Sequence, residues 1–101
     1  MKPILIVAAL SLMVTGAIGK TIANPPTAAQ LKTFYETCLK IAPSASVLCK
    51  CKEDAAPRLI DTAFMDVVIA SMKGKPLDAK YYDDYNNYIA RSNQICKPDY
   101  M

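Results

Sequence analysis

The chain contains no histidine and no tryptophan, and it has only three glycines among its 101 residues. Without histidine, it lacks the side chain that most often serves as a general base or a metal ligand near neutral pH. So few glycines also leave no glycine-rich loop of the kind that binds phosphate groups. The serines have neither a histidine nor a suitably placed lysine to act as a base. These absences predict a protein that is not an enzyme and that uses no cofactor or metal.

Acidic side chains are the remaining candidates for acid–base chemistry, but their spacing does not favour it. Glu53 and Asp54 are adjacent, and so are Asp83 and Asp84. Neighbouring residues on a helix point about 100° apart, so neither pair converges on one substrate atom. Because charged residues are mostly solvent-exposed, we expect these carboxylates, and that of Asp61, on the exposed faces of helices.

The N-terminal segment has the pattern of a secretory signal peptide. Lys2 precedes an apolar run at residues 4–14, and small residues follow it. A short basic start, an apolar stretch of ~7–15 residues and a small-x-small site define such a signal. We expect cleavage after Ala23, which makes residues 1–23 the signal; cleavage after Gly19 is the alternative. A membrane anchor is less favoured, because the apolar stretch barely reaches the ~20 residues of a spanning helix.

Removing the signal changes the charge of the chain. The full chain has 12 basic and 9 acidic side chains, a formal net charge of +3. Lys2 and Lys20 leave with the signal, so 10 basic and 9 acidic residues remain at 24–101, a net charge of +1. Such a domain lacks the basic surface typical of nucleic-acid-binding proteins. We therefore expect a single exported domain, periplasmic or secreted, that binds no nucleic acid and keeps no stable membrane anchor after cleavage.

Helical periodicity runs through the rest of the chain, and no segment alternates with the period of a strand. Thr27 and Gln30 have the spacing of a capping box, which marks a helix start. Lys73-Gly74 followed by Pro76 is a typical helix end. The sequence predicts an all-α bundle of three to four short helices. These helices are expected at residues 28–42, at 46–55, from Pro57 to the Lys73-Gly74 stop, and at 79–95.

The four cysteines predict two disulfide bonds. An even number of cysteines in a small exported protein is typical of disulfide cross-linking, and a C-x-C spacing fits neither a zinc site nor a thiol oxidoreductase. On a helix, Cys49 and Cys51 point about 200° apart, so each bonds to Cys38 or to Cys96 and not to the other. Both resulting pairings stay open. We expect Cys51 on the inward face with Val47, and Cys49 nearer the flank.

Tyrosines are concentrated at residues 81–88, which hold four of the six in the chain. Tyr81, Tyr85 and Tyr88 recur at helical spacing and would bury one helix face. Four tyrosines in eight residues cannot all share one narrow stripe, and tyrosine with asparagine is a composition typical of protein-recognition surfaces. The sequence therefore predicts a partner-binding surface formed by Tyr82, Tyr85, Asn86 and Tyr81.

Together these features predict a small exported, non-enzymatic protein-binding module. It could act as an inhibitor or as an immunity-type protein that neutralises a toxin or an enzyme. One alternative is a carrier or chaperone that binds apolar ligands in a pocket between the third and fourth helices, where Met65 and Ile69 would extend the apolar face into a groove. Another is an accessory component of an envelope secretion or conjugation system.

Overall fold

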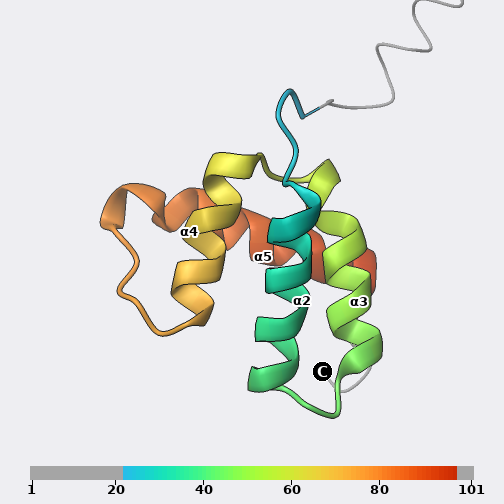
Figure 1. Ribbon diagram of the computed structural model, residues 1–101. Coiled ribbons are helices and arrows are strands. Elements are labelled where there is room, and N and C mark those ends of the chain that lie inside the picture. The colour runs from blue at the N-terminus through green and yellow to red at the C-terminus, as the bar shows by residue number, and fades with distance from the viewer. Residues whose placement is uncertain (1–21, 98–101) are drawn as a thin grey trace, which may run out of the picture.

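The computed structural model describes residues 22–97, and in this range all of the regular secondary structure is helical (Figure 1). The expected signal peptide, apart from its last two residues, lies outside the described residues. Within them, no helix has the length and apolar character needed to cross a membrane. The helices are α2 (Ala28–Ile41), α3 (Ser46–Ala55), the 3-10 turn η1 (Ala56–Arg58), α4 (Thr62–Met72), the 3-10 turn η2 (Ala79–Tyr81) and α5 (Tyr82–Cys96).

The first two helices form an antiparallel pair (Figure 1). The predicted capping box at the start of α2 is confirmed: the Gln30 N–H donates to the Thr27 hydroxyl at 3.1 Å, and the Thr27 N–H donates to the Gln30 side chain at 3.0 Å. A short turn after Ile41 reverses the chain. Proline at position 43 fits this turn, because it cannot continue the hydrogen-bonding pattern of a helix.

The third predicted helix is divided, which corrects the expectation of one helix beginning at Pro57. η1 ends at Arg58, and α4 begins only at Thr62. Asp61 adopts an extended conformation, and its carboxylate accepts the Phe64 N–H at 2.8 Å as the N-cap of α4. Asp61 is thus a capping residue and not part of an exposed helix face. A side-chain cap replaces a missing backbone partner at the helix start, so the chain can bend here.

The end of α4 follows the predicted pattern. Gly74 has a φ of +93°, a conformation that glycine adopts without a steric penalty. The Gly74 and Lys75 N–H groups donate to Ser71 and Ala70 carbonyls of the last turn, at 3.0 Å each. Asp78 then caps η2 by accepting the Lys80 N–H at 3.2 Å. The chain returns as α5, which runs behind the other helices in Figure 1.

Two disulfides connect the helices. Cys38 of α2 is bonded to Cys49, and Cys51 is bonded to Cys96 of α5, with Cα atoms 5.8 Å apart in each pair. The expected orientation of α3 is wrong: Cys49 is fully buried, whereas Val47 is 84% exposed. The disulfide to α2 turns Cys49 inward. Val47, two positions earlier on the helix, then points about 200° away from Cys49, toward solvent.

The core lies where α4 meets α2, η1 and α5. Phe34 enters it from α2, Met65 and Val68 from α4, and Tyr88 from α5. Burial of such large side chains contributes ~1.5–3 kcal/mol each to folding. The disulfides hold α2 and α5 to α3, whereas α4 carries no cysteine and is fixed by its apolar face.

Gln30 joins the start of α2 to the start of α4. Its amide NH₂ group donates to the Thr62 carbonyl at 2.9 Å and to the Asp66 carboxylate at 2.7 Å, while its oxygen accepts the Thr62 hydroxyl at 2.7 Å. The Thr62 N–H in turn donates to the Asn24 carbonyl at 2.7 Å. These bonds fix the start of α4 and hold the segment that precedes α2 against it.

Candidate functional site

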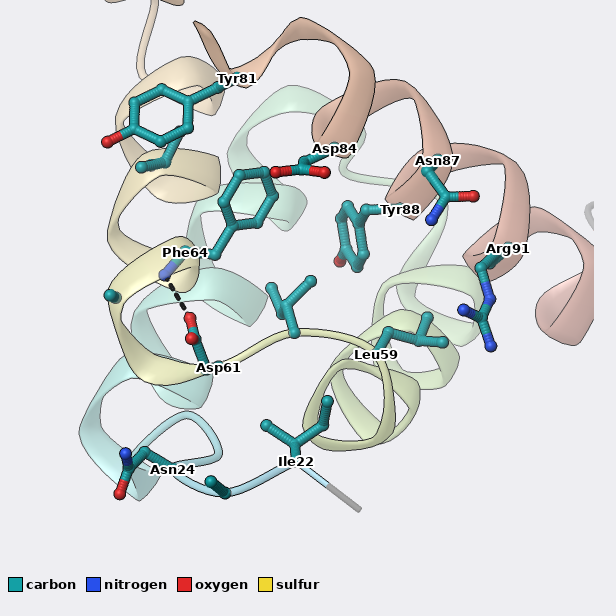
Figure 2. A pocket seen from close by; sticks show the side chains of 14 residues that line it. Ile22, Asn24, Leu59, Asp61, Phe64, Tyr81, Asp84, Asn87, Tyr88 and Arg91 are labelled. Carbon is teal, nitrogen blue, oxygen red and sulfur yellow. Dashed lines mark hydrogen bonds between the residues drawn. The ribbon is translucent and has the colours of Figure 1, made fainter. Parts of the chain in front are cut away.

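A pocket of about 510 Å³ lies between α4 and α5 (Figure 2). The break between η1 and α4 supplies one side of it, with Leu59, Ile60 and Asp61. If the third helix were continuous from Pro57, as the sequence suggested, these three residues would lie within a helix and not on this turn. The pocket therefore depends on the N-cap that starts α4 at Thr62.

The inner surface of the pocket is largely apolar. Leu59 and Ile60 come from the turn, and Phe64 and Val67 come from the face of α4 that is turned toward α5. Tyr81 packs edge-on against Phe64, with ring centroids 5.9 Å apart and planes at 66°. Aromatic pairs favour this arrangement, so it holds the η2 end of the pocket in place.

Tyr88 carries a buried polar group beside this apolar surface. Its side chain points from α5 into the pocket region (Figure 2), and the residue is only 4% exposed. Its hydroxyl has no hydrogen-bond partner among the described residues. Burial, and to a lesser degree the charge of Tyr85, raises the pKa of Tyr88 to about 12. The protein covers this hydroxyl, so Tyr88 contributes its ring and not its hydroxyl to the pocket lining.

Charged and amide groups surround the opening of the pocket. Asp84, Asn87 and Arg91 are exposed and lie at i, i+3 and i+7 on α5, so they share one helix face. Within the described part of the chain, Arg91 forms no ion pair. Asp61 lies across the pocket from Arg91 in Figure 2. The opening thus carries two carboxylates and one guanidinium group.

Residues 22–24 also line the pocket, from the segment that precedes α2. The bond from the Thr62 N–H to the Asn24 carbonyl holds this segment beside α4, and Pro26 is buried just after it. Ile22 and Ala23 belong to the expected signal peptide. The position of cleavage therefore decides whether they remain part of the pocket.

The four tyrosine and asparagine residues predicted to bind a partner lie in two environments. Tyr82 is 52% exposed and Asn86 is exposed one turn later on the same face of α5. Tyr81 and Tyr85 are half-buried: Tyr81 lines the pocket, and Tyr85 packs against the core. Only Tyr82 and Asn86 therefore form an open surface.

The predicted apolar groove on the third helix is wrong in its residues. Met65 and Ile69 are buried in the core and do not line this pocket. The pocket instead uses Ala63, Phe64 and Val67, which lie on a neighbouring face of α4. The sequence of a broad apolar helix face does not show which side of that face packs against the core and which side borders a cavity. Arg91 at the opening was also missed, although its helical spacing from Asp84 and Asn87 was a usable signal.

The remaining charged groups of α3 have local structural roles. Lys50 pairs with Glu53 at 3.0 Å and with Asp54 at 3.6 Å. The hydrogen bond to Glu53 and the charge of Asp54 raise the pKa of Lys50. Burial of the half-buried Lys52 lowers the pKa of its amine. Residues 22–97 contain no group of three cysteine or acidic side chains placed to hold a metal ion.

The chain matches no family model, no curated protein and no solved structure. Functional inference therefore depends on the pocket and on the exposed surface of α5.

Proposed function

We propose that this protein is an exported, non-catalytic binding protein that holds an apolar ligand in the pocket between α4 and α5. The observation that carries the proposal is the pocket itself, which brings apolar side chains of α4 and the preceding turn together with polar side chains of α5.

The size and lining of the pocket support this proposal. Ligand sites in proteins usually measure ~300–1,000 Å³ and combine apolar walls with a few polar groups that orient the ligand. The pocket, at about 510 Å³, lies within this range. Its apolar residues come from α4 and the preceding turn, and its polar groups come mainly from α5.

The two disulfides support the exported location. Such bonds form and persist in oxidising compartments such as the periplasm or the exterior of the cell. All four cysteines are paired within the described residues, which leaves no free thiol there for redox or metal chemistry. The signal-peptide pattern at residues 1–23 points to the same location.

Native mass spectrometry of the exported protein tests this function. We expect a bound small molecule, or binding of an added apolar compound, that is lost when Ala63→Trp fills the pocket. Ala90→Trp is the matched control, because Ala90 is exposed on α5 and does not line the pocket. Binding that survives Ala63→Trp, or that is lost equally in both variants, would contradict the proposal.

A second candidate function is docking of a partner protein on α5, as an inhibitor or immunity-type protein would require. The favouring observation is the exposure of Tyr82 beside Asn86. A photo-reactive amino acid at position 82 should then cross-link one partner in cells that export the protein, and the same amino acid at position 90 should not. Equal labelling from both positions would remove this candidate.

A further inference from the structure

We infer that the end of the molecule at which α2 and α4 terminate docks reversibly on an anionic lipid surface. The basic end, as we call it, is formed by five exposed residues: Lys40, Ile41, Val47, Lys73 and Lys75. Docking there does not depend on the proposed function, because none of these residues lines the pocket.

The fold brings the ends of α2 and α4 to the same side of the molecule. Gln30, in the first turn of α2, is hydrogen-bonded to Thr62 and Asp66 in the first turns of α4, so the two helices start together. They pack against each other and run in the same direction (Figure 1). The α2–α3 turn and the Lys73-Gly74 end of α4 therefore lie at the opposite end from these hydrogen bonds.

Positive charge is concentrated at this end. Residues 37–47 and 67–77, which include the ends of α2 and α4 and the turns that follow, contain three lysines and no aspartate or glutamate. Lys40, Lys73 and Lys75 are exposed, and none of them forms an ion pair within the described part of the chain. The net charge of +1 that remains after removal of the signal does not show this asymmetry, because the acidic side chains lie elsewhere in the sequence.

Two aliphatic side chains are exposed at the same end. Ile41 is 60% exposed and Val47 is 84% exposed, which makes them the most exposed large apolar residues of the described chain. They lie on either side of the α2–α3 turn, as the last residue of α2 and the second residue of α3. Helix dipoles favour a lysine at the end of a helix, but they do not explain aliphatic side chains left in water.

An anionic bilayer surface matches this combination of groups. Its charge attracts lysines, and its interfacial region accepts apolar side chains that reach past the head groups. Single-stranded nucleic acid also carries negative charge, but it binds proteins by stacking its bases on aromatic rings, and the basic end contains no aromatic residue. A second copy of this chain, placed end to end, would be repelled by the same three lysines.

Docking through the basic end also leaves the pocket away from the lipid. Asp61 and residues 22–24 line the pocket and adjoin the starts of α4 and α2, at the other end of these helices. Only two large apolar side chains would enter the lipid surface, so we expect the protein to bind reversibly and not as a permanent anchor.

Co-sedimentation of the exported protein with lipid vesicles tests this docking. The probes are vesicles of phosphatidylcholine that contain about a third phosphatidylglycerol, and vesicles of phosphatidylcholine alone. We expect binding to the anionic vesicles to be at least about tenfold tighter than binding to the neutral ones, as three lysines near the surface allow. Raising the salt concentration should weaken this binding, because salt screens exposed charges.

Paired charge variants make the test specific to the basic end. Lys73→Gln combined with Lys75→Gln should weaken binding to the anionic vesicles by about tenfold or more. Lys32→Gln combined with Arg58→Gln is the matched control, because it removes two exposed positive charges from outside the basic end. Circular dichroism should show both double variants to be folded.

A fluorescent side chain tests whether the apolar tip enters the lipid. The chain has no tryptophan, so Val47→Trp introduces a single probe at the basic end. Its emission should shift to shorter wavelength when anionic vesicles are added. Tyr82→Trp, at an exposed position of α5, should show no such shift.

Several results would overturn the docking of the basic end on anionic lipid. These are equal binding to both kinds of vesicle, binding to neither, equal weakening in the two double variants, and no emission shift for Val47→Trp. Light scattering that finds a dimer, lost in Val47→Asp, would identify a second copy as the occupant and would also overturn it. None of these results bears on ligand binding in the pocket, which is tested separately.

Discussion

Tyr88 is the residue whose ring and hydroxyl are expected to affect folding stability in opposite directions. Its ring belongs to the core, with Met65 and Val68, whereas its hydroxyl has no partner among the described residues. Removing a buried polar group that lacks a partner is nearly neutral or stabilising, because no hydrogen bond is lost.

Tyr88→Phe should therefore leave the free energy of unfolding unchanged or raise it by about 1 kcal/mol. Urea denaturation followed by circular dichroism measures this change, and Tyr82→Phe serves as the exposed control. A loss of more than about 1 kcal/mol in Tyr88→Phe would show that the hydroxyl is hydrogen-bonded in the folded protein, and would contradict the account of the site.

The raised pKa of Tyr88 also predicts an alkaline dependence of stability. In the unfolded chain a tyrosine releases its proton near pH 10, but in the folded protein Tyr88 keeps it until about pH 12. Between these values the unfolded state binds fewer protons, so stability falls as the pH rises. Full stability is present below pH 10, and the loss by pH 12 is about 2 kcal/mol.

The difference between the native protein and Tyr88→Phe isolates this effect from the titration of lysines. Above pH 10, we expect the free energy of unfolding of the native protein to fall relative to that of Tyr88→Phe. Rapid unfolding measurements at pH 9, 10, 11 and 12 test this expectation. A difference that stays constant over this range would mean that Tyr88 titrates normally.

At the residue scale, sequence reasoning could predict that Tyr88 is buried, because it lies at helical spacing from Tyr81 and Tyr85. It could not predict that the hydroxyl lacks a partner, since that depends on which atoms of the turn before α4 approach it. The place of Arg91 beside the pocket could be recognised only once α5 was seen against that turn.

Among the helices, the boundaries with strong local signals could be predicted. The capping box of Thr27 and Gln30 and the stop at Lys73-Gly74 are formed by residues near one another in sequence. The break before Thr62 was missed because the apolar periodicity continues through Leu59 and Ile60. The extended backbone of Asp61 and the hydrogen bond that its carboxylate accepts from the Phe64 N–H distinguish a new helix start from an uninterrupted helix.

The rotation of α3 could not be read from its sequence either. Val47 and Cys49 lie two positions apart and point in nearly opposite directions on a helix. Which of them is buried is decided by the bond from Cys49 to Cys38 on another helix. The angle between positions 49 and 51 on a helix excluded a bond between Cys49 and Cys51, but it was compatible with both remaining pairings.

Tryptic mapping of the unreduced protein tests the disulfide pairing directly. Trypsin cuts after Lys50, which separates Cys49 from Cys51. We expect the peptide that contains Cys38 to be joined to the one ending in Cys49-Lys50, and Cys51-Lys52 to be joined to the peptide that begins at Ser92. Mass spectrometry before and after reduction identifies the joined peptides. The exchanged combination would contradict the fold.

For the whole molecule, the segment before α2 links export to the pocket. Ile22 and Ala23 line the pocket, and Asn24 is held by the Thr62 N–H. Cleavage after Ala23 would remove two apolar residues from the pocket lining and leave the hydrogen bond to Asn24. Cleavage after Gly19 would keep both residues and a more enclosed site.

N-terminal sequencing of the exported protein decides between these forms. We expect Asn24 as the first residue, because the small residues at positions 21 and 23 satisfy the small-x-small pattern. A first residue at Lys20 would contradict this expectation and would leave Ile22 and Ala23 in the pocket. Retained protein with residues 1–19 intact would contradict export by a cleaved signal.

The central claim is that the pocket between α4 and α5 is the ligand site, and an NMR titration tests it most directly. 1-Octanol, an apolar probe, added to ¹⁵N-labelled exported protein should shift amide signals in residues 59–67 and 84–91. The signals of Ile41 and Val47, which are the exposed apolar residues at the α2–α3 turn, should stay in place. Shifts centred on Ile41 and Val47, or no shifts in the pocket residues at the highest probe concentration, would contradict the account.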